Sequence, residues 1–108
     1  MMEMWVETTC EMAHRVEDPI GVPRLHGHSY WVRVYVQSDV DHLVSAIQVQ
    51  ADLRRHLRSI DHSLMNDTLP TGTMEEMARW VDKAMSGWKV TRVAIERKSL
   101  GVGVEFRV

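Results

Sequence analysis

Residues 26–37 alternate between two kinds of side chain, and this alternation constrains the fold more than any other feature of the chain. Successive side chains of a β-strand point to opposite faces, so the even-numbered positions share one face. Those positions carry two histidines and then four apolar residues: His26, His28, Tyr30, Val32, Val34 and Val36. Residues 4–15 form a second β-rich run that lacks glycine and proline, and a loop with two prolines and a glycine (residues 17–24) separates the runs. This arrangement predicts an antiparallel hairpin.

Three histidines gather at the loop end of the predicted hairpin. His26 and His28 lie at i and i+2, and His14 ends the first strand on the face that also carries Val6 and Cys10. Three neutral imidazoles without an evident fourth protein ligand are typical of a catalytic zinc site, in which water or substrate takes the open position. Any single histidine could instead be a surface or core residue, and spacing alone leaves both interpretations open.

The remainder of the chain predicts two helices and two more strands. Apolar residues at helical spacing indicate a helix over residues 47–59, and a loop follows over residues 61–72. Thr73 with Glu76 forms a capping-box pattern that opens a second helix, and Gly87 is a stop signal. Residues 90–98 and 102–108 predict strands around a turn at residues 100–101. The order ββααββ indicates an α+β fold, a four-stranded antiparallel sheet with two helices on one face, in a single domain over residues 1–108. Its uncovered edges favour oligomerisation into a barrel.

Composition restricts the partners that we expect for this chain. The formal net charge of −2 argues against a nucleic-acid surface, and the apolar runs are too short to span a membrane. The N-terminal residues show no secretory signal, so we expect a cytoplasmic protein. Cys10, the single cysteine, has no partner for an internal disulfide, and we interpret it as a buried packing residue.

Five short motifs give the chain a resemblance to a known family. They are Ala13-His14, residues 25–30 (Leu-His-Gly-His-Ser-Tyr), residues 60–66 (Ile-Asp-His-Ser-Leu-Met-Asn), residues 73–80 (Thr-Met-Glu-Glu-Met-Ala-Arg-Trp) and residues 93–96 (Val-Ala-Ile-Glu). In this order and spacing the chain resembles the 6-pyruvoyltetrahydropterin and 6-carboxytetrahydropterin synthases of the tunnelling fold. The similarity runs from about Val6 to the C-terminus.

The resemblance implies a role for each matching residue. His14, His26 and His28 match the three zinc ligands of the family. Asp61 and His62 match a proton relay, Glu96 matches the carboxylate that anchors the pterin, and Thr73 and Glu75 match further contacts in the pterin pocket. Family members assemble as homohexamers, two stacked trimeric barrels with active sites between subunits. On the sequence alone, Asp61 and His62 could instead form a solvated turn, and Glu96 could be a surface strand residue.

Two positions depart from the family pattern. Val22 occupies the place of the cysteine that usually acts as a base four residues before the first histidine of the His-Gly-His motif, and valine cannot accept a proton. One branch of the family uses a loop glutamate instead, and the only acids in this loop are Glu17 and Asp18. Cys10 is no obvious replacement. Arg97 follows Glu96 where threonine is commoner.

These residues lead to a ranked set of functions. The first is a zinc-dependent lyase that converts 7,8-dihydroneopterin triphosphate to 6-carboxy-5,6,7,8-tetrahydropterin, on the route to queuosine and other 7-deazaguanine nucleosides. The second is a 6-pyruvoyltetrahydropterin synthase, which eliminates triphosphate. A third is a pterin- or purine-binding homologue that has lost its chemistry, motivated by Val22. A cupin metal site is disfavoured, because residues 31–34 (Trp-Val-Arg-Val) lack the glutamate that such a site needs.

Overall fold

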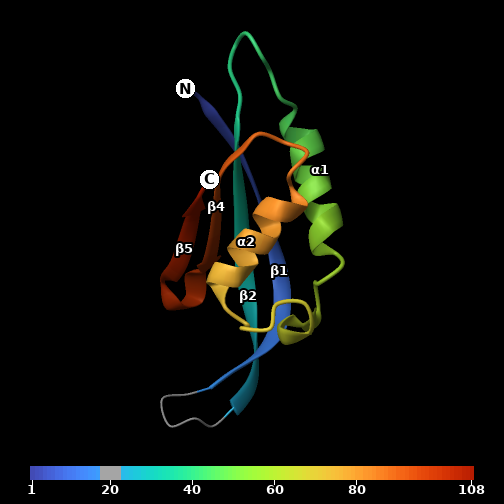
Figure 1. Cartoon of the computed structure of the whole chain (residues 1–108), viewed down its shortest axis with the longest axis vertical. Coiled ribbons are helices and arrows are strands. Elements are labelled where there is room, and N and C mark those ends of the chain that lie inside the picture. Colours follow the sequence, from blue (N-terminus) through green and yellow to red (C-terminus); the bar gives the residue numbers. More distant parts are fainter. Residues whose placement is uncertain (18–22) are drawn as a thin grey trace.

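One twisted sheet with two helices on one of its faces makes up the protein, as a computed structural model that describes residues 1–17 and 23–108 shows (Figure 1). In chain order the elements are β1 (Glu3–Glu17), β2 (Pro23–Gln37), α1 (Ala46–Leu57), β3 (Ser63–Leu64), the 3₁₀ turn η1 (Met65–Asp67), α2 (Met74–Ala84), β4 (Val90–Arg97), the 3₁₀ turn η2 (Lys98–Leu100) and β5 (Val102–Arg107). The strands lie in the order β3-β1-β2-β4-β5. The predicted α+β class is therefore confirmed.

The β1–β2 hairpin is the longest feature of the molecule and extends well past the helices (Figure 1). Its antiparallel register runs without a break from Glu3 opposite Gln37, through His14 opposite His26, to Glu17 opposite Pro23. Both strands are longer than the sequence predicted: β1 runs to Glu17, and β2 begins at Pro23, inside the expected loop. β4 pairs only with residues 31–36 of β2, so within the described chain the loop half of β2 pairs with β1 alone.

A fifth strand corrects the predicted four-stranded sheet. Ser63 and Leu64 pair in parallel with Met12 and Ala13 of β1, inside a segment that the sequence predicted as a plain loop. Asp61 Oδ1 accepts a hydrogen bond from the Glu11 backbone N–H at 2.7 Å. The N–H of the following residue, His62, donates to Glu11 O at 2.5 Å. These bonds attach the segment to the free edge of β1.

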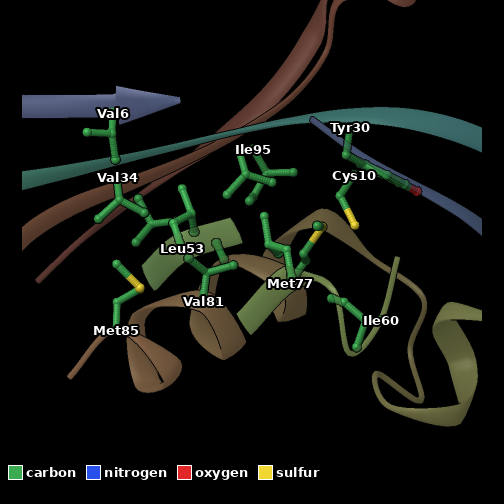
Figure 2. Close-up of a cluster of buried hydrophobic side chains, with 14 of the residues drawn as sticks. Val6, Cys10, Tyr30, Val34, Leu53, Ile60, Met77, Val81, Met85 and Ile95 are labelled. Carbon is green, nitrogen blue, oxygen red and sulfur yellow. The ribbon is translucent and has the colours of Figure 1, made fainter. Parts of the chain in front are cut away.

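The core lies between the even-numbered face of the sheet and the two helices. Figure 2 shows side chains of α1 and α2 directed at the strands, and the buried residues drawn there include Val6, Val34, Leu53, Met77, Val81, Met85 and Ile95. Burial of such apolar side chains is the main stabilising contribution to a fold of this size. Cys10 is 1% exposed within this cluster, as the sequence predicted.

Side-chain caps set the beginnings of both helices. Ser45 Oγ accepts from the Gln48 N–H, and Thr73 Oγ1 accepts from the Glu76 N–H, each at 3.3 Å. The second half of the predicted capping box differs, because Glu76 Oε1 accepts from the Thr71 N–H rather than from Thr73. In length and apolar character, both helices of the described chain fall short of what a bilayer crossing requires.

No helix of the described chain covers the odd-numbered face of the sheet, which instead carries interleaved cations and aromatic rings. The Arg33 guanidinium lies 4.1 Å from the Trp5 ring centre and 3.1 Å from Glu7 Oε1. The Arg92 guanidinium lies 3.8 Å from the Tyr35 ring centre. The long aliphatic and aromatic parts of these side chains shield the strands without a second layer.

Candidate metal centre

Three imidazoles converge near the loop end of the hairpin. The register places His14 directly opposite His26, and His28 lies two residues further along the same face. Each pair of rings has centroids 4.4 Å apart, with ring planes at 75° to 82° to one another. One ring nitrogen from each residue lies within 4.8 Å of the others. The predicted convergence of the three histidines is therefore present in a single chain.

A backbone carbonyl orients the first of these rings. His14 Nδ1 donates to Gly72 O at 2.8 Å, so the proton of the neutral ring is on Nδ1. The free Nε2 lies 2.9 Å from Nε2 of His26. A histidine ligand of a metal typically makes this second hydrogen bond, which fixes its tautomer and orientation.

Gly72 reaches His14 only because of its backbone conformation and the close packing around it. Its φ is +63°, which is costly for residues with a Cβ. A Cβ at this position would lie 2.9 Å from Asn66 Nδ2 and 3.1 Å from Arg15 O. Glycine is therefore required at this carbonyl.

Asn66 holds the loop before α2 against β1, beside His14. Its Oδ1 accepts from the Arg15 N–H at 2.6 Å, and its Nδ2 donates to Arg15 O at 2.9 Å and to Pro70 O at 3.0 Å. The side-chain amide thus pairs with the strand much as a neighbouring strand would. Asn66 belongs to one of the family motifs, but its role could not be predicted from the sequence, because its partner Arg15 is distant along the chain.

Burial favours the neutral, metal-binding form of two of the rings. It lowers the pKa of His14, which is 6% exposed. Burial also lowers the pKa of His28 to about 4, with a further contribution from the positive charge of Arg97. Neutral imidazole is the form that binds metals, so neither residue needs to lose a proton at neutral pH.

The residues of the cluster fit a zinc ion. Their set of three neutral imidazoles is one that catalytic zinc sites use, and it leaves a fourth position open. Nε2 of His28 is buried and has no hydrogen-bond partner among the described residues, a costly state that a ligand at the cluster would relieve. The hairpin ladder and the Gly72 contact can stay as they are with the rings facing a common centre, whereas the second ring nitrogen of His28, Nδ1, also contacts Arg97 Nη2 at 2.6 Å.

Asp61 and His62 form a hydrogen-bonded pair at the start of the β3 segment. His62 Nδ1 donates to Asp61 Oδ2 at 2.8 Å, which leaves His62 Nε2 free, and the His62 side chain is 76% exposed. Burial alone would raise the pKa of Asp61, but hydrogen bonds from the Glu11 backbone and from His62 lower it below its ordinary value. His62 has a φ of +57°, a conformation uncommon outside glycine and often found at functional positions.

The His62 side chain lines a groove whose β1 and β2 residues are mostly odd-numbered and so lie on the face opposite the histidine cluster, from which only His28 takes part. This groove, of about 520 Å³, is lined by residues of β1, β2 and the β3 segment, among them Glu11, His28, Ser29 and His62. Ser29 Oγ donates to Glu11 Oε2 at 2.6 Å on its wall. An imidazole whose Nδ1 is held by a carboxylate and whose Nε2 is open can give or accept a proton.

Glu96 lies on the other face of the sheet. It pairs with Trp31, an odd-numbered residue of β2, and therefore points away from the side that carries His26 and His28. It lines a separate groove of about 470 Å³ together with Lys98 and Gly103. One chain does not bring Glu96 and the histidine cluster to the same side of the sheet.

The remaining predicted pocket residues stand at the start of α2. Thr73 caps the helix and bonds to the Thr71 hydroxyl at 2.8 Å, directly after the glycine whose carbonyl holds His14. Glu75 is exposed in the first turn of the helix. The loop before α2 thus brings Thr73 near the cluster, while Glu75 faces solvent.

The candidates for the missing base fall partly outside the described residues. Val22 and Asp18 lie there, and Glu17 is described only as the last residue of β1. Burial, and then the charge of Asp61, raise the pKa of the Cys10 thiol to about 12, and the thiol hydrogen-bonds to Asp61. A buried thiol with so high a pKa is a structural residue and not a base at neutral pH.

A sheet with helices on one face and a histidine cluster in its long hairpin defines a class of small α+β proteins with a candidate metal centre. The model of the 6-pyruvoyl tetrahydropterin synthase family matches residues 3–103. The chain belongs to the 6-pyruvoyl tetrahydropterin synthase family.

Solved structures show the same fold. The Caenorhabditis elegans 6-pyruvoyl tetrahydropterin synthase is 15% identical with a TM-score of 0.79, over 99% of this chain and 95% of that one. A Plasmodium vivax 6-pyruvoyltetrahydropterin synthase, in which a catalytic glutamate is replaced by alanine, is 16% identical with a TM-score of 0.66, over 99% and 98%. An uncharacterized Wolinella succinogenes protein is 16% identical with a TM-score of 0.71, over 98% and 97%. The predicted tunnelling fold is confirmed.

Proposed function

We propose that this protein is a zinc-dependent lyase that converts 7,8-dihydroneopterin triphosphate to 6-carboxy-5,6,7,8-tetrahydropterin, for the synthesis of queuosine or related 7-deazaguanine nucleosides. Membership of the family supports a pterin-processing lyase. The observation that carries the proposal is the convergence of His14, His26 and His28, with His14 already oriented by the carbonyl of Gly72.

In this proposal the three histidines hold the zinc and leave one position for the substrate. Zinc bound by neutral ligands supplies Lewis acidity toward a hydroxyl or carbonyl oxygen of the substrate side chain. The backbone carbonyl on His14 Nδ1 keeps that ring in the ligating tautomer. The surrounding burial keeps His14 and His28 neutral, as ligation requires.

Asp61 and His62 would move protons on the substrate side chain. The carboxylate holds His62 Nδ1 at 2.8 Å and stabilises the imidazolium that forms when Nε2 takes up a proton. Histidine suits this role because its ordinary pKa lies near neutral pH. Asp61 is in turn held by the Glu11 backbone, so the pair is attached to the same strand that carries His14.

Glu96 would anchor the pterin through a pair of hydrogen bonds to the donor edge of the ring. Because it lies on the face opposite the histidines, we propose that neighbouring copies complete each site in a homohexamer of two stacked trimeric barrels. The uncovered odd-numbered face and the unpaired edge of residues 23–30 in the described chain support such an assembly. Thr73 and Glu75 would contribute further contacts to the pocket.

Two alternatives remain within the same fold. A 6-pyruvoyltetrahydropterin synthase would use the same residues to eliminate triphosphate. A pterin-binding protein without turnover is favoured by one specific observation, which is that Val22 occupies the position of the family's cysteine base. In the lyase, Glu17 or Asp18 would have to replace that base.

The test is turnover of 7,8-dihydroneopterin triphosphate by the zinc-loaded protein, with the product identified by mass spectrometry. We expect 6-carboxytetrahydropterin, and we expect His62→Gln and Asp61→Asn to lower the rate by roughly a hundredfold or more while zinc content is unchanged. Exposed His42→Gln is the matched control. Stoichiometric zinc and tight pterin binding without any turnover would contradict the lyase and support the binding protein.

A further inference from the structure

Arg97 makes an unusual contact with the histidine cluster. Its Nη2 lies 2.6 Å from Nδ1 of His28, at the end of β4. Among the described residues Arg97 forms no ion pair with a carboxylate, although the neighbouring Lys98 lies 3.8 Å from Glu7 on the other side of the sheet. The Arg97 guanidinium thus contacts a candidate metal ligand and no carboxylate of the described residues.

The direction of this hydrogen bond assigns the proton on His28. A guanidinium can only donate, so Nδ1 accepts and the proton of the neutral ring is on Nε2. That Nε2 is the atom that is buried without a partner among the described residues. A metal at Nε2 requires the other tautomer, in which Nδ1 carries the proton and faces the Arg97 donor. Metal binding through Nε2 and the Arg97–His28 hydrogen bond therefore exclude each other.

The charges around the cluster indicate what a released Arg97 would bind. The three candidate ligands are neutral, so a bound zinc ion keeps its full charge of two. Glu96 lies on the opposite face of the sheet, and Asp61 is already held by Glu11 and His62. Arg97 adds a third positive charge with a planar pair of donors, which suits a carboxylate or phosphate group.

We propose that Arg97 is an anion-binding residue of the metal site, released from His28 when the metal binds and then available to a carboxylate or phosphate oxygen of the ligand. This inference rests on the zinc site of the proposed function and adds the class of ligand group that the site selects. A ligand with an anionic group beside its metal-binding oxygen would contact the metal and Arg97 together.

The first test measures the affinity of the metal-free protein for zinc by competition with a chromophoric chelator. Arg97→Gln removes both the competing hydrogen bond and a positive charge, so we expect roughly fivefold tighter zinc binding than in the wild type. Lys98→Gln removes the same charge one residue away on the opposite face and should leave the affinity unchanged. Equal or weaker zinc binding by Arg97→Gln would overturn the inference.

The second test uses the cobalt-loaded protein, whose visible spectrum reports a new ligand at the metal. Acetate and inorganic phosphate are titrated separately, which distinguishes a carboxylate from a phosphate preference. We expect Arg97→Gln to weaken binding of the preferred anion about tenfold or more, and Arg97→Lys to weaken it less. Unchanged affinities for both anions would overturn the inference and leave the metal centre intact. Failure of both wild type and Arg97→Gln to take up metal would overturn the metal centre itself.

Discussion

The two halves of the β1–β2 hairpin carry different side chains on the same face of the same two strands. Toward the N-terminus of β1 the even-numbered face presents Val6 and, across the ladder, Val34, both buried under the helices. Toward the loop the same face presents His14 and, across the ladder, His26. Helices cover the first half, whereas the second half meets the loop before α2 and the end of β4.

One half of the β1–β2 hairpin therefore stabilises the fold, and the other half carries the candidate functional site. The apolar half is closed by α1 and α2 and has the character of a core. The histidine half and the β3 segment beside it carry features that cost stability in the free chain. Among them are Nε2 of His28, which has no partner among the described residues, and the uncommon backbone conformation of His62. Conflicts between local preference and fold are typical of functional sites.

The largest effect on the free energy of unfolding should come from a substitution that empties part of the core under the apolar half of the hairpin. Leu53→Ala removes a fully buried side chain of α1, and we expect a loss of about 2–5 kcal/mol in the free energy of unfolding, measured by urea denaturation of the metal-free protein. The exposed Ile47→Ala on the same helix should change it by less than about 0.5 kcal/mol. A small effect at Leu53 would contradict the division of the hairpin into two halves.

Removing a candidate metal ligand should lower the affinity for zinc and leave the stability of the metal-free protein nearly unchanged. His26→Ala should weaken zinc binding by roughly a hundredfold or more, because a ligand is lost. The free energy of unfolding of the metal-free protein should change by less than about 0.5 kcal/mol, since His26 is exposed. Chelator competition and urea denaturation measure the two quantities, and His42→Ala is the control. Zinc affinity that survives His26→Ala would place the metal elsewhere.

A smaller effect on zinc affinity is expected at Asn66, which lies outside the cluster and holds the loop beside His14. Asn66→Ala removes three hydrogen bonds between the loop and its neighbours, so we expect zinc affinity to fall about tenfold. The adjacent exposed Asp67→Ala should leave zinc affinity unchanged. If both substitutions behave alike, Asn66 does not position the metal centre.

The stability of the metal-free protein should also depend on pH through His28. Burial lowers the pKa of His28 to about 4, so the unfolded chain binds a proton here more readily than the folded chain. The stability contributed by the neutral ring is present above about pH 6.5 and is lost as the pH falls toward about 4. The unfolding free energy of the wild type, relative to that of His28→Gln, should therefore fall over this range. A constant difference would show that the ring is not held neutral.

The hairpin and the position of its histidines could be predicted from the sequence, because alternation with period two transfers directly into the sheet. His14, His26 and His28 share a face for the same reason that Val6 and Val34 do. The fifth strand could not be predicted in this way. Two residues are too few to show a period, and the segment is attached by Asp61 to a strand 50 residues earlier in the chain.

The faces of Glu96 and Arg97 also depended on long-range structure. Adjacent strand residues point to opposite faces, so only one of them can face the histidines. Which one does is set by the pairing of β4 with β2, in which Glu96 lies opposite Trp31 on the odd-numbered face. The hydrogen bond from Arg97 to His28 needs in addition that the end of β4 come close to the loop half of β2, and it was not predicted.

The central claim is that the histidine half of the hairpin is a metal centre, and a crystal structure of the zinc-loaded protein tests it most directly. Anomalous scattering at the zinc absorption edge should show one ion per chain, about 2.0–2.1 Å from nitrogens of His14, His26 and His28. His14 Nδ1 should remain bonded to Gly72 O. Zinc bound at other residues, or a fully loaded protein without density between these three rings, would contradict the account.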